Sequence, residues 1–85
     1  MTYRVEFTSA AAREVKKLPR LARERVLVAI ETLAANPRPA GSTKLVGEGT
    51  AWRLRVGDYR IIYDVFDDVL TVVIVRTGHR RDVYR

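Results

Sequence analysis

The sequence has 85 residues, enough for one small domain (residues 1–85) and too few for a second hydrophobic core. Sixteen basic and ten acidic residues give a net charge of +6, which favours a partner rich in phosphate or carboxylate over a neutral one. Without cysteine and with one histidine, the chain excludes a disulfide framework and a structural zinc site, and we expect no cofactor. No long apolar segment occurs near the N-terminus, so we expect a cytoplasmic protein without a membrane span.

The first half of the chain predicts one strand and two helices. Apolar and polar residues alternate over residues 2–7, as in a half-buried strand. Thr8 or Ser9 can cap a helix over residues 10–18, and the proline that follows suits the first turn of a second helix over about residues 20–35. Two helices with a short break between them predict an antiparallel helical hairpin packed on a sheet.

The second half predicts three further strands. Residues 36–43 are rich in proline, glycine and alanine and indicate a loop. Strands follow at 52–56 and 59–65, joined by a Gly-Asp turn, and at 69–76; residues 77–85 form a tail that leaves the sheet. The order β-α-α-β-β-β predicts an α+β fold: a twisted, mostly antiparallel four-stranded sheet with the helical hairpin on one face.

Three arginines gather in the hairpin of the second and third strands. Because side chains alternate across a strand, Arg53 and Arg55 point away from the face of Trp52 and Leu54, which pack inward. Arg60 lies on the neighbouring strand, within reach of the other two. Such charges repel one another, and an anion between them would relieve the repulsion. The alternative is a basic surface that only keeps the protein soluble.

The hairpin and the C-terminal motifs resemble the RelE/ParE superfamily of toxins, and the likeness extends over nearly the whole chain. The resemblance is carried by Trp52-Arg53-Leu54-Arg55, Gly57-Asp58-Tyr59-Arg60-Ile61-Ile62-Tyr63, Gly78-His79-Arg80 and Asp82-Val83-Tyr84. It implies a type II toxin–antitoxin toxin, neutralised by a RelB-like antitoxin, that reaches DNA only indirectly through that antitoxin. For the RelE-like branch it implies cleavage of mRNA in the A site of the 70S ribosome, without a metal, by attack of the RNA 2′-hydroxyl on the adjacent phosphate.

The resemblance also implies roles for single residues. Arg55, Arg60 and Arg80 would stabilise charge on the phosphate, and Tyr84 would orient the nucleotide or its 2′-hydroxyl. RelE-like enzymes can carry lysine at the position of Arg53, as a proton acceptor. Arginine stays protonated in proteins, so we expect Arg53 to contribute charge only.

The remaining predicted site residues are basic or titratable. His79 is the possible acid or base, because histidine ordinarily titrates near neutral pH. A surface histidine or an RNA contact is the alternative for it. We expect further RNA contacts from Lys44, Arg81 and Arg85.

Two other functions remain open at this stage. A ParE-like toxin would inhibit DNA gyrase by binding the protein, on the same fold. A degenerate toxin would act only as a co-repressor together with its antitoxin. The retained basic residues and Tyr84 favour the nuclease over the ParE-like toxin, and growth arrest without the antitoxin would exclude the co-repressor.

Overall fold

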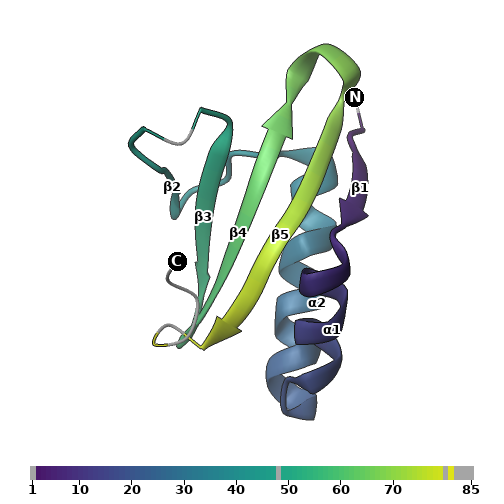
Figure 1. The fold of residues 1–85 in the computed structure, drawn as a ribbon, viewed down its shortest axis with the longest axis vertical. Coiled ribbons are helices and arrows are strands. Elements are labelled where there is room, and N and C mark those ends of the chain that lie inside the picture. The colour runs from purple at the N-terminus through teal and green to yellow at the C-terminus, as the bar shows by residue number, and fades with distance from the viewer. Residues whose placement is uncertain (1, 48, 80, 82–85) are drawn as a thin grey trace.

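The computed structural model describes residues 2–47, 49–79 and 81 of the chain. Five strands form one sheet in the order β1-β5-β4-β3-β2, in which β1 runs parallel to β5 and all other pairs are antiparallel. Both helices lie on the same side of this sheet (Figure 1), which confirms the predicted α+β fold. The elements in chain order are β1 (Arg4–Phe7), α1 (Ser9–Lys17), α2 (Arg20–Ala35), β2 (Ser42–Lys44), β3 (Ala51–Val56), β4 (Tyr59–Phe66), the 3₁₀ turn η1 (Asp67–Val69) and β5 (Thr71–His79).

Local signals set the helix bounds. The Thr8 hydroxyl accepts a hydrogen bond from the Ala11 amide at 3.1 Å and so caps α1. Pro19 then separates α1 from α2, since it lacks the N–H that would continue the first helix. The predicted helical hairpin is therefore confirmed. Within the described ranges, no helix is long and apolar enough to cross a membrane.

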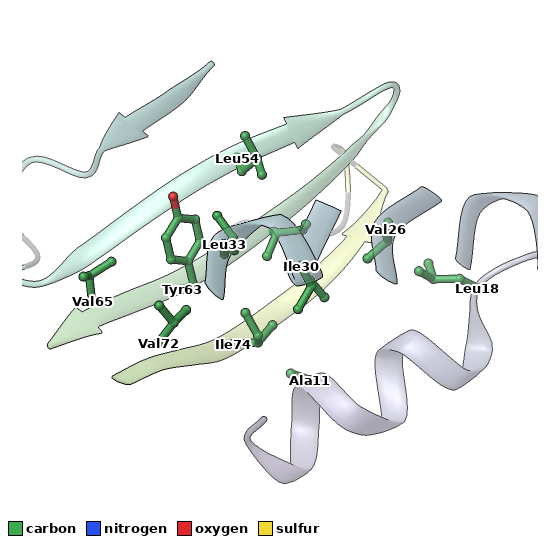
Figure 2. Close-up of a cluster of buried hydrophobic side chains, with 11 residues drawn as sticks. Ala11, Leu18, Val26, Ile30, Leu33, Leu54, Tyr63, Val65, Val72 and Ile74 are labelled. Atoms are coloured by element: carbon green, nitrogen blue, oxygen red, sulfur yellow. The ribbon is translucent and has the colours of Figure 1, made fainter. Parts of the chain in front are cut away.

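The core lies between the helical hairpin and one face of the sheet (Figure 2). Helix α2 contributes an apolar stripe at helical spacing, and β4 and β5 contribute their alternate residues. Trp52 and Val56 of β3 and Tyr59 of β4 are partly buried against this cluster, and for Trp52 this is the inward position that the sequence predicted. The buried members are Ala11, Leu18, Val26, Ile30, Leu33, Leu54, Ile61, Tyr63, Val65, Val72 and Ile74.

The structure corrects two of the predicted bounds. Residues 42 and 43, expected in a loop, form the edge strand β2 together with Lys44, with Ser42 opposite Leu54, so the sheet has five strands instead of four. A strand of three residues is too short to show a periodic pattern in the sequence. Strand β5 continues to His79, whereas the sequence predicted a tail from residue 77. It stays in the sheet because β4 pairs with it along this whole stretch.

Candidate functional site

The hairpin of β3 and β4 positions the predicted arginines. A two-residue turn, Gly57–Asp58, joins the strands, with Val56 opposite Tyr59 and Arg55 opposite Arg60. Gly57 has a φ of 60°, which glycine adopts without the steric penalty of a side chain. The predicted hairpin is thus confirmed, and its register brings two arginines directly opposite each other.

Arg53, Arg55 and Arg60 share one face of the sheet, which we call the arginine face. Val56 and Tyr59 pack against the core, so the next pair along the ladder, Arg55 and Arg60, points to the side without helices. Directly opposite residues have Cβ atoms about 4.5–5.5 Å apart. The Arg55 side chain is exposed, whereas Arg60 is only 8% exposed. The exposed Arg55 side chain, placed directly opposite a second arginine, favours an anionic ligand at this place.

A groove of about 580 Å³ opens beside β2 and β3, where Arg53 and Arg55 meet Gly41, Thr43 and Gly57. Thr43 lies directly opposite Arg53 in the sheet. Neither Arg53 nor Arg55 forms an ion pair within the described part of the chain. Guanidinium groups match phosphate oxygens in pairs, so this groove suits a phosphate better than an uncharged ligand. Thr43 and Gly41 were missed in the sequence because β2 itself was missed.

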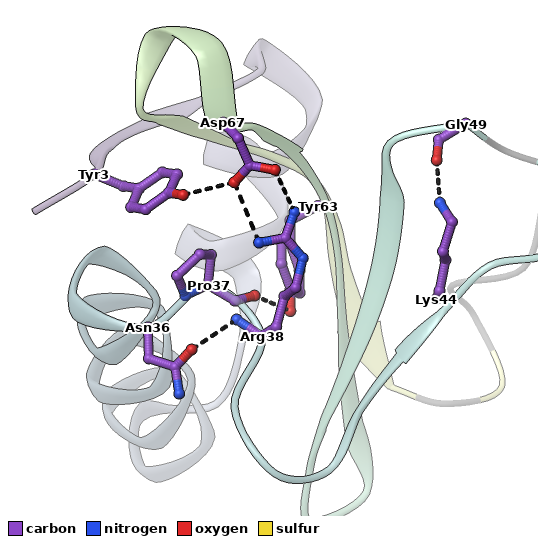
Figure 3. A network of polar contacts seen from close by, with 8 residues as sticks. All are labelled: Tyr3, Asn36, Pro37, Arg38, Lys44, Gly49, Tyr63 and Asp67. Atoms are coloured by element: carbon purple, nitrogen blue, oxygen red, sulfur yellow. Dashed lines mark hydrogen bonds and ion pairs between the residues drawn. The ribbon is translucent and has the colours of Figure 1, made fainter. Parts of the chain in front are cut away.

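The other end of the sheet holds an arginine whose charge is neutralised internally (Figure 3). Arg38 donates two hydrogen bonds to the Asp67 carboxylate, at 2.7 and 3.2 Å, and the Tyr3 hydroxyl donates a third at 2.6 Å. The Arg38 guanidinium lowers the pKa of Asp67, and the hydrogen bond with Asp67 raises the pKa of Tyr3. Below them, the buried Tyr63 hydroxyl donates to the Pro37 carbonyl at 2.8 Å. These contacts link the loop after α2 to the sheet.

His79 lies across the sheet from the arginine face. It pairs with Tyr59, which packs toward the helices, and the two rings meet edge to face at 5.6 Å. The His79 Nδ1 accepts a hydrogen bond from the Arg81 amide at 3.2 Å. The structure therefore does not bring the possible acid or base onto the same face as Arg55 and Arg60.

Lys44, expected to contact RNA, also lies away from the arginine face. It is opposite Trp52, with its ammonium 5.8 Å from the indole centroid, and it donates a hydrogen bond to the Gly49 carbonyl. Arg38 packs on the same ring at 5.4 Å. Two cations therefore share Trp52, which supports the predicted packing role of this residue.

The remaining predicted residues cannot be placed as a group. Arg81 is exposed beside the end of β5. Arg80, Tyr84 and Arg85 lie outside the described residues, and their roles stay predictions. In the described ranges, no group of three or more histidine, cysteine or acidic residues is arranged to hold a metal ion.

A small α+β fold with a cationic groove on the open face of its sheet defines a protein suited to an anionic ligand. Residues 5–84 match the family described as the ParE toxin of the type II toxin–antitoxin system parDE. The chain therefore belongs to the RelE/ParE toxin family of type II toxin–antitoxin systems, as its motifs predicted.

Individual relatives agree with this assignment and are RelE-like. Toxin RelG of Mycobacterium tuberculosis is 37% identical, and the match covers 100% of this chain and 99% of RelG. The toxin–antitoxin complex RelBE2 of Mycobacterium tuberculosis contains a chain with a TM-score of 0.81 and 34% identity, covering 94% of this chain and 100% of that one. The archaeal RelE–RelB complex of Pyrococcus horikoshii contains a chain with a TM-score of 0.83 and 31% identity, with coverages of 98% and 100%.

Proposed function

We propose that this toxin is a ribosome-dependent mRNA endonuclease. It would bind in the A site of the 70S ribosome and cleave the mRNA held there. The observation that carries the proposal is the cross-strand pair of Arg55 and Arg60 on a face that lacks helices, beside the groove of Arg53. The RelE-like relatives support the same activity over other uses of a cationic face.

The reaction uses the RNA as its own nucleophile. The 2′-oxygen of one nucleotide bonds to the adjacent phosphorus as the bond from phosphorus to the 5′-oxygen breaks. The products are a 2′,3′-cyclic phosphate and a free 5′-hydroxyl, which takes up a proton as the 2′-hydroxyl loses one. Negative charge builds up on the phosphate oxygens during attack, so guanidinium groups fixed beside them stabilise the transition state more than the substrate.

In this proposal the arginines supply charge and hydrogen bonds, and none of them is the base. Arg55, Arg60 and Arg80 would contact the phosphate, Arg53 would add positive charge, and Tyr84 would orient the nucleotide. An arginine stays protonated, and His79 faces the opposite side of the sheet from Arg60. A proton acceptor supplied outside the arginine face accounts for dependence on the ribosome.

The antitoxin is the second proposed partner. Relatives from Mycobacterium tuberculosis and Pyrococcus horikoshii were solved as toxin–antitoxin and RelE–RelB complexes. We expect a RelB-like antitoxin with an acidic segment that wraps this chain, whose net charge is +6, and a separate domain that binds operator DNA. Toxin and ribosome would meet in the cytoplasm.

Primer extension on mRNA in a translating extract tests the proposal. The wild-type protein should produce new 3′ ends within codons, whereas Arg60→Ala and Arg80→Ala should produce none. Both variants should still bind the antitoxin, which shows that they are folded. Undiminished cleavage by both variants, or intact mRNA with the wild-type protein, would contradict the proposed activity.

A ParE-like action on DNA gyrase is the second candidate, because the matched family is described by its ParE members. Inhibited supercoiling by purified gyrase, together with intact mRNA in the extract, would establish it. Growth arrest on expression without the antitoxin would exclude the third possibility, a toxin that acts only as a co-repressor.

A further inference from the structure

A second groove, of about 360 Å³, lies on the helix side of the sheet at the turn between α1 and α2. Its walls come from the end of α1 and from the paired ends of β4 and β5. We call it the helix-side groove. The residues that matter for its chemistry are Lys17, Leu18, Pro19, Tyr59, Thr77 and His79.

The helix-side groove carries a positive charge that its own carboxylate does not neutralise. Glu14 accepts a hydrogen bond from Arg76 Nε at 2.8 Å with one oxygen and from the Thr77 amide at 2.9 Å with the other. The carboxylate and Arg76 thus neutralise each other and hold the end of β5 against α1. Lys17 forms no ion pair within the described ranges, so its ammonium remains for a ligand.

The groove also offers hydrogen-bond donors. Because His79 Nδ1 accepts from the Arg81 amide, the proton of the neutral ring is on Nε2. The Thr77 side chain is 2% exposed, and its hydroxyl has no hydrogen-bond partner among the described residues. A buried hydroxyl without a partner is unfavourable, and a ligand or a water held by it would remove that penalty.

The remaining walls suit a planar ring. The Tyr59 and His79 rings meet at an interplanar angle of 79°, and Leu18 and Pro19 add apolar surface to the lining of the groove. Unpaired bases bind to aromatic and apolar side chains in this way, while their phosphates contact lysine or arginine. An acidic peptide would use the lysine but would gain little from the rings.

We propose that the helix-side groove binds a nucleotide of single-stranded RNA, next to the one whose phosphate contacts the arginine face. This rests on the proposed function, because it assumes that the arginine face holds RNA. The register supports it: Arg60 pairs with Gly78 and Tyr59 with His79, so consecutive residues of the same two strands carry the two sites on opposite faces. A strand of RNA passing the end of the sheet contacts both.

The test uses the full chain and a short 2′-O-methyl RNA oligonucleotide, which lacks the attacking hydroxyl and cannot be cleaved. Lys17→Glu should weaken its binding about tenfold, whereas Lys16→Glu should weaken it only about twofold, by the general change of charge. Both lysines are exposed in the last turn of α1, but only Lys17 lines the groove. The NMR signals of the Tyr59 and His79 rings should shift on binding to the wild-type protein.

Equal losses for the two variants, or ring signals that do not move, would overturn the inference. So would an acidic peptide that shifts these ring signals when the oligonucleotide does not. The measurement needs no cleavage. If the oligonucleotide binds as expected while mRNA stays intact in the extract, the proposed nuclease activity is contradicted, and binding of RNA in the helix-side groove is still supported.

Discussion

The two ends of the sheet use arginine in opposite ways. Arg38 is held by the Asp67 carboxylate and by the ring of Trp52. Its positive charge is therefore neutralised within the protein, and its contacts join the loop after α2 to the sheet. Arg55 has no ion pair in the described part of the chain and lies exposed, opposite a second arginine. The difference teaches that position within the fold, and not residue type, separates an arginine that stabilises the protein from one available to a ligand.

The largest expected effect is the loss of mRNA cleavage when an arginine that is available to a ligand is removed. Arg55→Ala should reduce mRNA cleavage about 10²- to 10³-fold, as removal of one transition-state donor does in other enzymes. The free energy of unfolding should change by less than about 0.5 kcal/mol, since the side chain is exposed. Cleavage in a translating extract and urea unfolding measure the two quantities.

Arg38→Ala is the matched control for that variant. It should leave cleavage intact and lower the free energy of unfolding by roughly 0.5–1 kcal/mol, a modest value because the pair with Asp67 is partly exposed. If Arg38→Ala abolished cleavage while Arg55→Ala only destabilised the protein, the division between the two ends would be wrong.

A smaller, purely structural effect is expected at Tyr63. Its hydroxyl is fully buried, and burial raises its pKa. Tyr63→Phe leaves the Pro37 carbonyl without its partner, which should cost about 1–2 kcal/mol in urea unfolding and leave cleavage unchanged. Tyr3→Phe, which loses an exposed hydrogen bond, should have a smaller effect. Equal losses in the two variants would show that burial of the Tyr63 hydroxyl is not what matters.

The smallest expected effect is a dependence of stability on acid pH. Because the Arg38 guanidinium lowers the pKa of Asp67 in the folded protein, this carboxylate stabilises the fold above its ordinary pKa of about 4. That stabilisation disappears as the pH falls through the lower, folded-state pKa. Asp67→Asn should therefore flatten the acid side of a plot of urea midpoint against pH. Asp68→Asn, which breaks no ion pair among the described residues, should leave that side of the curve as steep as in the wild type.

The elements that could be predicted are those whose causes are local in the chain. Thr8 caps α1 through a residue three positions away, and a proline two residues after Lys17 separates the helices. Gly57 permits the tight turn that places Arg55 opposite Arg60. The sequence therefore predicted that these two arginines lie close together. Capping, helix breaking and hairpin turns depend on residues close in sequence, and a single sequence carries that information.

The contacts that could not be predicted join residues that lie far apart in the chain. The carboxylate of Asp67 reaches Arg38 across 29 positions, and that of Glu14 reaches the Thr77 amide across 63. Neither pairing leaves a periodic pattern, so the neutralised arginines looked the same as Arg55 in the sequence. The placement of His79 on the helix side likewise follows from the continued pairing of β5 with β4. The sequence by itself therefore determined the helices, the hairpin and the family, because these depend on local patterns and motifs. Only long-range packing, which brings carboxylates to some arginines and leaves others open, decided which charges remain for a ligand.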